Sequence, residues 1–328
     1  PKRKIGGAEI LFNEIDQHNN DEIDLYKYDL NIQTNNPYIY LSSLVKFLLF
    51  IKKNKIDFVI SSLWKSHLIS FFVCIFSNTK SIPFIHSSSF FNFYDRFFTN
   101  LLLCLSKACI VDSNKSCDFV ESKFKHIDVF KVSTHIKFKN YSSTEKNYLS
   151  LDKDLLRFIF LGRICDVKRI DKSIALLNNL VQHQIDVVFD LFGPIEVSHS
   201  KIKKWEDSSN FKINFNSPLE RNQIPHILRG YDFYIQLSDI EGMAMSVIES
   251  MSLGLIPLVT KVGEISNYCE HGKNSLCYDK EDSVGSISEN FLEHLSNLNN
   301  LNSMSKNAIQ TSKTYLDFKI DFLTGKTE

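Results

Sequence analysis

Short apolar runs alternate along this chain with longer amphipathic stretches. The apolar runs predict strands over 23–29, 57–61, 81–86, 108–112, 129–133, 157–163, 187–193, 211–215, 231–235, 256–260 and 276–278. The amphipathic stretches predict helices over 8–18, 41–53, 65–76, 95–107, 114–123, 168–183, from about 201, 221–228, 246–253 and 284–303. Regular alternation of strands and helices is typical of a parallel sheet with helices on both faces, so the expected fold class is α/β.

A polar, unpatterned segment over 138–154 divides this pattern and is interpreted as a linker. The expected domains are therefore 1–140 and 151–303, with a final helix over 304–328 that crosses back to the first domain. A strand should precede the glycine loop at Gly6-Gly7, but almost nothing does, so we expect the first strand to be missing or to lie upstream. A cleft between two such domains is a natural place for two substrates to meet.

The charge of the chain limits which classes of binding partner are expected. The chain has 328 residues, with 38 Lys+Arg and 38 Asp+Glu, and this balance gives no support for nucleic-acid binding. The halves differ, because residues 1–150 carry an excess of about five positive charges and the remainder the opposite excess. A basic half fits a peripheral contact with anionic lipid, and variation in surface charge is the alternative.

The location is expected to be cytoplasmic, with a possible peripheral position at the inner face of the cytoplasmic membrane. No secretory signal is expected, and the longest apolar stretch, Leu68–Phe76, is too short to span a bilayer. The seven cysteines are odd in number and include no CxxC pair. They indicate a reducing compartment and argue against a disulfide framework or a zinc site.

The segment from Asp239 to Thr260 carries the most specific chemistry. Seven residues separate Glu241 from Glu249, Gly242 follows the first glutamate, and the helix expected from Ser246 begins close by. A helix N-terminus offers unbonded N–H groups and a partial positive charge, which suit a bound phosphate. Carboxylates accept hydrogen bonds from sugar hydroxyls, so the segment predicts a site for a phosphate-linked sugar.

Other candidate residues lie where predicted strands end. Gly162-Arg163 follows one strand, with Lys168 shortly after, and Gly193 ends the next strand. Two cations there would clamp a diphosphate. The alternatives are ordinary surface charges for Arg163 and Lys168, solvated glutamates, and a plain turn at Gly6-Gly7. His86 ends another strand and is either functional or a satisfied core histidine.

These residues resemble the family 4 glycosyltransferases, which have the GT-B fold of two facing Rossmann-like domains with parallel sheets and an interdomain cleft. The similarity rests on the E-x7-E pattern and on these segments: GGAE (6–9), IPFIHSSS (82–89), FLGRICDVKRIDKSI (160–174), LFGP (191–194), SPLERNQIPHILRGYDFYIQLSDIEGMAMSVIESMSLGLIPLVTKVGE (217–264) and EHGKNSLCYD (270–279). The chain departs from the family pattern at Glu264, Asn267 and Ser275 and over 133–135, which leaves the sugar and the acceptor open.

The resemblance implies a role for each matching residue. Arg163 and Lys168 would bind the donor diphosphate and stabilise the leaving nucleotide. Glu249 would hold the ribose, Glu241 the transferred sugar, and His86 would contact that sugar near the reacting centre. The remaining donor-binding positions would be Gly7, Gly162, Gly193, Gly242, Met243, Ala244, Met245 and Ser246.

The resemblance also implies a reaction that retains anomeric configuration and needs no metal or other cofactor. The expected enzyme is a glycosyltransferase of the hexosyltransferase type that uses a nucleotide-diphosphate sugar and acts in synthesis of a bacterial surface polysaccharide (lipopolysaccharide O-antigen, capsule or exopolysaccharide). A glycan or lipid-linked glycan would accept the sugar, and the aromatic segment from Phe90 to Tyr94 is core, acceptor pocket or membrane-facing. The alternatives are a nucleotide-sugar hydrolase or epimerase, and a non-catalytic glycan-binding partner of the same fold.

Overall fold

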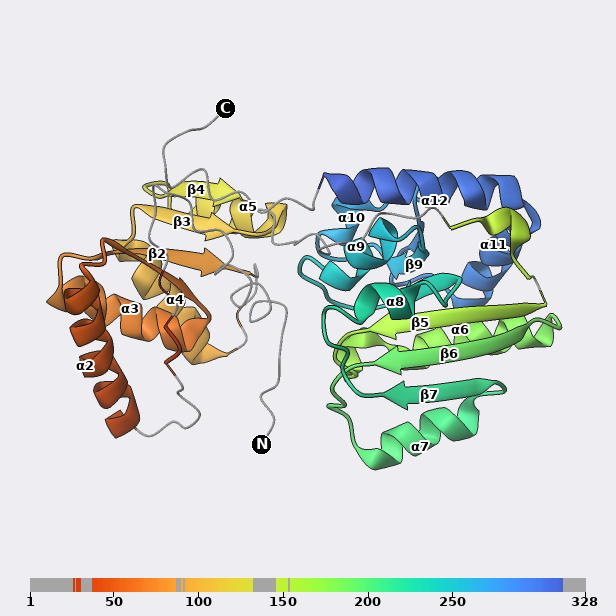
Figure 1. Cartoon of the computed structure of the whole chain (residues 1–328), viewed down its shortest axis with the longest axis horizontal. Coiled ribbons are helices and arrows are strands. Elements are labelled where there is room, and N and C mark those ends of the chain that lie inside the picture. Colours follow the sequence, from red (N-terminus) through yellow and green to blue (C-terminus); the bar gives the residue numbers. More distant parts are fainter. Residues whose placement is uncertain are drawn as a thin grey trace. The chain divides into compact units, whose positions relative to one another are not determined.

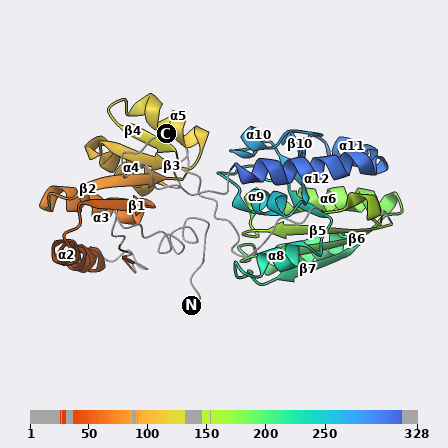
Figure 2. The same cartoon turned by 45° about the horizontal axis from the view of Figure 1, so that its top comes forward.

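The computed structural model describes residues 26, 28–30, 37–86, 90, 92–131, 146–152 and 154–314. Among these, residues up to 131 form one compact unit, the N-terminal unit, and residues from 146 onward form a second, the C-terminal unit (Figure 1, Figure 2). The loop at Gly6-Gly7, the helix expected over 8–18, most of the strand expected over 23–29 and the tail after residue 314 lie outside the described residues. Each unit contains helices and a parallel sheet, which confirms the α/β class.

The N-terminal unit is built from four strands and four helices among its described residues. In chain order they are α2 (Pro37–Asn54), β1 (Phe58–Ser62), α3 (Trp64–Phe76), β2 (Lys80–Ile85), α4 (Phe93–Leu105), β3 (Ala108–Val111), α5 (Asn114–Lys123) and β4 (Asp128–Lys131). The strands pair in the order β1-β2-β3-β4, all parallel. Buried Phe47, Ile51, Val59, Ile69 and Val73 join α2 and α3 to β1, so the apolar runs expected to be strands do form the core.

The C-terminal unit has a sheet of six parallel strands in the order β10-β9-β8-β5-β6-β7. Its strands are β5 (Leu155–Leu161), β6 (Asp186–Phe192), β7 (Lys212–Asn216), β8 (Phe233–Gln236), β9 (Ile256–Thr260) and β10 (Leu276–Tyr278). Its helices are α6 (Ile170–Gln182), α7 (His199–Ser208), α8 (Ile224–Leu228), α9 (Met245–Ser252), α10 (Ile265–Tyr268), α11 (Val284–Ser296) and α12 (Leu298–Lys313), with short 3₁₀ turns η2 (Tyr148–Ser150) and η3 (Asp166–Lys168).

The sheet of the C-terminal unit is covered on both faces. Successive side chains of a strand point to opposite faces, and β5 sends Phe158 and Phe160 to one buried cluster and Ile159 and Leu161 to another. The first cluster includes residues of α6, α7 and α11, and the second includes residues of α8, α9 and α10. Burial on both faces explains why β5 reads as a continuous apolar run rather than as an alternating one.

The strand order of this sheet places a crossover beside β5. The chain runs from β5 to β6 and β7 on one side, and then returns to place β8 against the other side of β5. Loops after β5 and β8 therefore diverge at the carboxyl edge of the sheet. Ligands of open α/β sheets bind at such a switch point.

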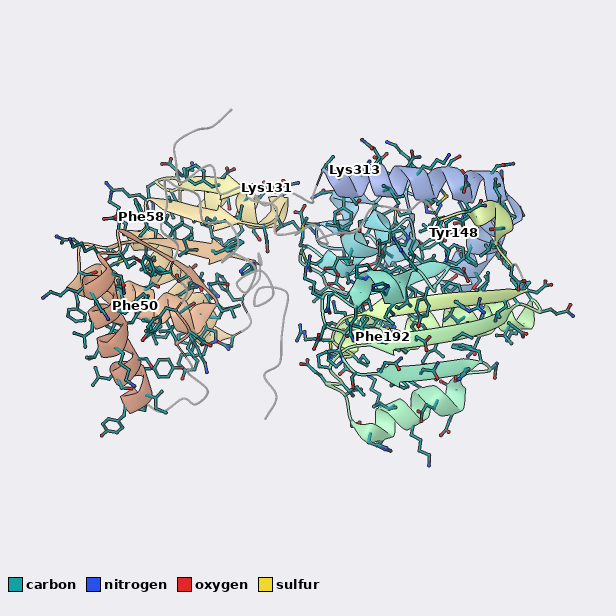
Figure 3. All side chains as sticks on the ribbon, viewed as in Figure 1. Phe50, Phe58, Lys131, Tyr148, Phe192 and Lys313 are labelled. Atoms are coloured by element: carbon teal, nitrogen blue, oxygen red, sulfur yellow. The ribbon has the colours of Figure 1, made fainter. Side chains whose placement is uncertain are left out.

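The segment interpreted as a linker is partly a core element. Tyr148, labelled in Figure 3, is fully buried, and its hydroxyl donates to the Asp232 carbonyl oxygen at 2.5 Å and accepts from the Ile256 amide at 3.0 Å. Lys146 also pairs with the Asp232 carboxylate at 3.2 Å. The polar composition of 138–154 concealed this anchor, because a single tyrosine sets up no periodic pattern.

Several helix bounds also differ from expectation. The helix expected over 284–303 is two helices, because Asn297 leaves helical geometry and caps α12 by accepting from the Asn300 amide at 3.1 Å. α12 runs without a break across residues 303 and 304, where a domain boundary was expected. The helix expected from residue 168 begins at Ile170, after Arg169 adopts a left-handed conformation, and α8 begins at Ile224 after a turn.

Candidate functional site

Two glycines bring the loops after β5 and β6 into backbone contact. A Cβ atom on Gly193 would lie 1.7 Å from the Gly162 carbonyl oxygen, so no larger residue fits at position 193. The Gly162 amide donates to the Phe192 carbonyl oxygen at 3.0 Å, and the Ile164 amide donates to the Pro194 carbonyl oxygen at 2.9 Å. Phe192 is labelled at the end of β6 in Figure 3. The crossing fixes the start of the loop that carries Arg163 and Lys168.

Lys168 and Glu241 form an ion pair across the switch point. The Lys168 Nζ atom lies 2.7 Å from each carboxylate oxygen of Glu241. The two side chains are only 14% and 6% exposed, so the pair is largely removed from water. Lys168 comes from the loop after β5 and Glu241 from the loop after β8. The structure therefore brings together a cation and a carboxylate that the sequence assigned to neighbouring parts of one ligand.

A buried network of hydrogen bonds through Gln236 holds the Glu241 carboxylate. The Gln236 Nε2 atom donates to Glu241 Oε1 at 2.5 Å, and the Gln236 amide oxygen contacts the hydroxyls of Tyr234 and Ser246. Tyr234 Oη lies 2.8 Å from Ser246 Oγ. Burial raises the pKa of Tyr234, so its hydroxyl stays protonated and neutral. Sequence reasoning missed Gln236, the last residue of β8, and Tyr234, which lies two positions before it.

Glu249 also has a cationic partner. It is buried on α9, and its Oε1 atom accepts from Arg221 Nη1 at 2.8 Å. Arg221 comes from the turn before α8, 28 positions away in sequence. The expectation for Arg221 was only a helix start, and no local pattern marks it as a partner of Glu249. The basic residue within the SPLERN segment of the family resemblance was the one available signal.

The segment between β8 and α9 has an unusual backbone. Ala244, the residue before α9, has φ 51° and ψ 60°, a left-handed conformation that costs a residue with a Cβ atom roughly 1–2 kcal/mol. Tyr268 Oη donates to the Met243 carbonyl oxygen at 2.9 Å. Gly263 has φ 60°, and a Cβ atom there would lie 2.3 Å from the Glu241 carbonyl oxygen. The glycine after β9 thus lets the two loops touch, and sequence reasoning missed it.

The remaining donor-binding candidates of this unit line the same edge. Met243 is buried, Gly242 is exposed, and Ala244, Met245 and Ser246 are intermediate. The Gly242 carbonyl oxygen accepts from the Glu264 amide at 3.0 Å, so the loop after β9 holds this backbone. The predicted contacts of these residues with a donor stay predictions.

Arg163 is much more exposed than Lys168. Its guanidinium is 52% exposed and contacts Glu196 at 3.2 Å. Beside Lys168, Arg169 pairs with Asp171 and with Asp239, each at 3.1 Å. Arg169 and Asp239 line a polar hollow of about 530 Å³ together with Asp166, Val167, Asp171, Lys201, Lys204, Trp205 and Ser208. Arg163, Lys168 and Arg169 thus all lie in the segment after β5, and each of the three forms an ion pair with a carboxylate.

The N-terminal unit has its own polar cluster at the carboxyl edge of its sheet. His86 follows β2, and its Nδ1 atom lies 2.8 Å from Asp112 Oδ2, just after β3. Its Nε2 atom lies 2.7 Å from Ser62 Oγ, the last residue of β1. The His86 side chain is 20% exposed. Gly7, the other candidate of this half, lies outside the described residues.

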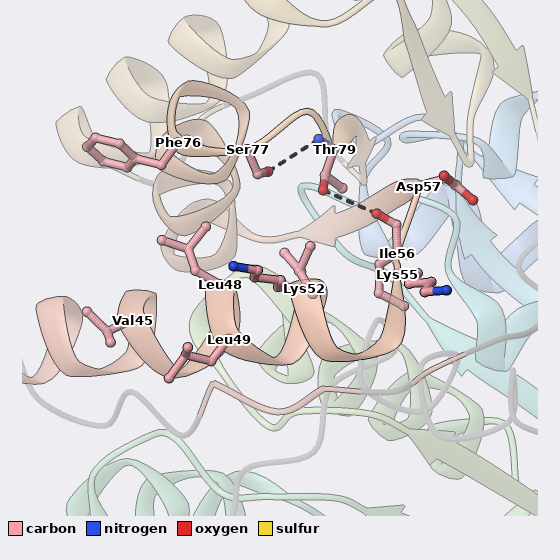
Figure 4. Close-up of a pocket in the computed structure, with 11 residues that line it drawn as sticks. Val45, Leu48, Leu49, Lys52, Lys55, Ile56, Asp57, Phe76, Ser77 and Thr79 are labelled. Carbon is pink, nitrogen blue, oxygen red and sulfur yellow. Dashed lines mark hydrogen bonds between the residues drawn. The ribbon is translucent and has the colours of Figure 1, made fainter.

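The N-terminal unit also has a hollow, which lies at the opposite edge of its sheet from His86. The cavity of about 510 Å³ is bordered by α2, by the end of α3 and by residues that precede β1 and β2 (Figure 4). Its wall combines Val45, Leu49 and Phe76 with Lys52 and Asp57. Because Asp57 precedes β1 and Ser62 ends it, this cavity does not belong to the cluster around His86.

Within the described ranges, no group of three His, Cys, Asp or Glu side chains is arranged to hold a metal ion. None of the helices in that part of the chain is long and apolar enough to cross a bilayer. All seven cysteines are free thiols, with Cys109, Cys269 and Cys277 buried.

Comparisons with known proteins show which family and which solved structures this chain is similar to. The family model described as glycosyl transferases group 1 matches residues 141–311, slightly more than half of the chain. No curated protein sequence matches. Among solved structures, the chain is similar to Anabaena Alr3699/HepE in complex with UDP-glucose, with 15% identity, a TM-score of 0.71, and coverage of 87% of this chain and 81% of that chain.

Two further structures show the same likeness. A Staphylococcus aureus (S. aureus) TarM mutant in complex with fondaparinux, alpha-GlcNAc-glycerol and UDP has 17% identity and a TM-score of 0.64, covering 83% of this chain and 57% of that chain. A glycosyltransferase from Rickettsia africae ESF-5 has 14% identity and a TM-score of 0.68, covering 98% and 86%. The chain thus spans little more than half of the TarM chain. At these identities the likeness shows a shared fold, GT-B, as expected from the sequence.

Proposed function

Because this chain belongs to the group 1 glycosyl transferases, we propose that it is a retaining glycosyltransferase of family 4. It moves a sugar from a nucleotide-diphosphate sugar to a glycan or lipid-linked glycan. The pathway we propose is synthesis of a bacterial surface polysaccharide, namely O-antigen, capsule or exopolysaccharide. The E-x7-E segment from Glu241 to Glu249 supports the assignment to family 4.

The observation that carries this proposal is the Lys168–Glu241 pair at the switch point of the C-terminal sheet. A lysine ammonium has three N–H donors, so Lys168 can keep Glu241 and also donate to a phosphate oxygen. Arg163, in the same loop after β5, is half-exposed and offers a planar fork of donors that suits a phosphate group. Negative charge grows on the diphosphate as the sugar leaves, and fixed cations stabilise that charge.

Each glutamate has a separate role in this proposal. Glu249, held by Arg221 at 2.8 Å, accepts hydrogen bonds from the ribose hydroxyls. Glu241, held by Lys168 and Gln236, accepts from hydroxyls of the transferred sugar. Amides over Met243 to Met245 donate to the sugar or the phosphate. Because Lys168 and Arg163 supply the electrostatic work of a cation, we expect turnover to survive chelation of divalent metals.

A nucleotide titration tests the proposal. HepE and TarM were solved with UDP or a UDP sugar, so UDP is the first ligand to try and GDP is the second. We expect one of them to raise the melting temperature of the full chain, with an increase that grows with nucleotide concentration. Mass spectrometry with a panel of nucleotide sugars and glycans then separates transfer from hydrolysis or epimerisation. Absence of stabilisation by either nucleotide would refute donor binding.

We also propose that the N-terminal unit contacts an anionic membrane, which would present a lipid-linked acceptor. Three aromatic side chains at the start of α4 support this: Phe93, Tyr94 and Phe97 are 73%, 59% and 50% exposed. Exposed aromatic residues beside a basic surface favour the membrane interface. Flotation with anionic liposomes is expected to carry the protein upward at low salt only. Equal recovery without liposomes would contradict this contact.

A further inference from the structure

Three strand ends of the N-terminal unit converge on one imidazole. Ser62 ends β1, His86 follows β2 and Asp112 follows β3, and these strands are neighbours in the order β1-β2-β3. His86 Nε2 lies 2.7 Å from Ser62 Oγ, and His86 Nδ1 lies 2.8 Å from Asp112 Oδ2. The family resemblance marked only His86, so Ser62 and Asp112 have no assigned role.

When the imidazole is neutral, the donor and acceptor capacities of these groups fix the direction of this chain of hydrogen bonds. A carboxylate only accepts hydrogen bonds, so Asp112 requires a proton on His86 Nδ1. A neutral imidazole carries one N–H, which leaves a lone pair on Nε2. The Ser62 hydroxyl then donates to that lone pair. The order of donation is therefore Ser62 to His86 to Asp112.

The surroundings strengthen the contact with Asp112. The Asp112 side chain is 7% exposed, and its Oδ1 atom is buried with no hydrogen-bond partner within the described part of the chain. His86 Nδ1 therefore contacts a buried carboxylate. Hydrogen bonds removed from water are electrostatically stronger, so this contact is a strong one. The Phe84 ring lies 4.1 Å from the imidazole between ring centroids and limits rotation of the ring.

We propose that Asp112 is a positioning residue that holds His86 in the tautomer whose Nε2 atom accepts a hydrogen bond, and that Ser62 holds this lone pair until a substrate hydroxyl replaces it. The inference rests on the proposed function, since the hydroxyl belongs to the sugar or the acceptor of glycosyl transfer. The hydroxyl group of Ser62 is chemically like the group that it stands in for. His86 therefore selects a hydroxyl rather than a carbonyl oxygen.

Histidine ¹⁵N NMR of the full-length protein tests the tautomer directly. The ten histidines are distinguished by comparison with His86→Gln. We expect the His86 signal to show a protonated Nδ1 and an unprotonated Nε2. In Asp112→Asn the amide can donate to Nδ1, so the proton should move to Nε2, as the general logic of a histidine held by a carboxylate requires. Ser62→Ala should leave the tautomer unchanged.

Kinetics give the second readout. Asp112→Asn should lower kcat on the order of 10²-fold, with a small change in KM for the donor. Ser62→Ala should lower kcat far less than Asp112→Asn does, because it removes the group that the substrate displaces and leaves the tautomer in place. A protonated Nε2 in the wild-type protein, or an unchanged tautomer in Asp112→Asn, overturns the proposal. Equal loss of kcat in Ser62→Ala and Asp112→Asn also overturns it.

The two proposals fail in different ways. If no nucleotide binds and no sugar is transferred, the proposed function fails, whereas the NMR result still decides the tautomer. If transfer occurs and the tautomer differs from expectation, only the role of Asp112 fails. A circular dichroism melt of each variant confirms that it is folded at the temperature of measurement.

Discussion

The two units place polar clusters at equivalent points of their sheets, but they build them from different side chains. The C-terminal cluster consists of ion pairs, Lys168 with Glu241 and Arg221 with Glu249. The N-terminal cluster is a chain of single hydrogen bonds through His86. Both lie where parallel strands end. The comparison indicates that the architecture sets the position of each cluster, whereas the side chains set its charge.

The charge of each cluster determines which kind of chemical group could bind there. A lysine or arginine paired with a carboxylate keeps further N–H donors for an anion. In the tautomer proposed above, the imidazole of His86 would present one directional acceptor, which suits a hydroxyl. The C-terminal cluster is also braced by loop contacts at Gly193 and Gly263, so its loops tolerate little change. Each variant below tests one of the contacts or backbone conformations that distinguish the two units.

The largest effect is expected from Lys168→Ala. It leaves the Glu241 carboxylate, which is 6% exposed, without its cation, and breaking a buried pair in this way costs about 3 kcal/mol or more of unfolding free energy. UDP affinity should fall and turnover should drop on the order of 10²-fold. Urea unfolding measures the stability, calorimetric titration measures the UDP affinity, and a sugar-transfer assay measures the turnover. His86→Gln should leave UDP affinity unchanged.

Lys201→Ala is the matched control for this variant. Lys201 pairs with Asp166, but those side chains are 38% and 76% exposed, and exposed pairs contribute about 0–1 kcal/mol. We therefore expect near wild-type stability and UDP affinity. If Lys168→Ala behaves like Lys201→Ala in both measurements, the charged cluster does not hold the diphosphate.

Gly263→Ala should come next in size. Its Cβ atom would lie 2.3 Å from the Glu241 carbonyl oxygen, and its φ of 60° is strained for any other residue. Strain of this kind together with a backbone clash should cost about 3 kcal/mol. Gly285→Ala is the control, because the nearest atom to a Cβ there is 3.9 Å away. Equal melting temperatures for the two variants would contradict the tight approach of the loops.

A histidine of the N-terminal unit should make stability depend on pH. Burial lowers the pKa of His67 to about 4, below its ordinary 6.5, and the nearby His86 acts in the same direction. The unfolded chain therefore binds a proton between pH 6.5 and 4 that folded His67 does not. The free energy of unfolding should fall as pH decreases through this window, by at most about 3 kcal/mol, and the contribution should level off below pH 4.

The His67→Gln variant isolates this contribution. Glutamine can keep contacts with the Ser61 carbonyl oxygen and the Thr99 hydroxyl, which His67 makes at 3.2 Å and 2.9 Å. It does not titrate, so the difference in unfolding free energy between wild type and variant should change between pH 7 and pH 4. A difference that stays constant over this range would show that His67 is not held neutral.

The smallest effect is expected from Ala244→Gly. Ala244 has φ 51° and ψ 60°, and glycine adopts this conformation without a steric penalty. The relief is partly offset by the greater freedom of glycine in the unfolded chain, so we expect a gain of about 0.5–1 kcal/mol. Chemical denaturation measures it. A clear loss of stability would mean that the alanine methyl group makes contacts that outweigh the backbone strain.

Local pattern predicted the strands and most helices because each strand buries a run of apolar residues. Lys168 and Glu241 were each assigned to a strand end, but their contact joins residues 73 positions apart. That contact follows from the pairing of β5 with β8, which local sequence does not determine. Gly193 and Gly263 both stood in segments of the family resemblance, 191–194 and 217–264, but the tight approach of each to another loop left no sign in the sequence.

The missed residues share one physical cause. Gln236, Arg221, Ser62 and Asp112 act through partners on other strands or loops. A polar residue at a strand end looks the same in sequence whether it faces solvent or a buried charge. The sequence therefore indicated which edges carry chemistry, and the sheet order supplied the partners.

The buried Tyr148 determines where the C-terminal unit can be cut. A fragment that starts at residue 151 would omit a ring that packs against Phe233 with centroids 5.7 Å apart and a hydroxyl that bonds two backbone groups. Loss of a buried aromatic ring typically costs about 3–5 kcal/mol. A fragment that starts before Lys146 keeps this anchor and its ion pair with Asp232. The choice of first residue therefore determines whether an isolated C-terminal unit keeps this buried anchor.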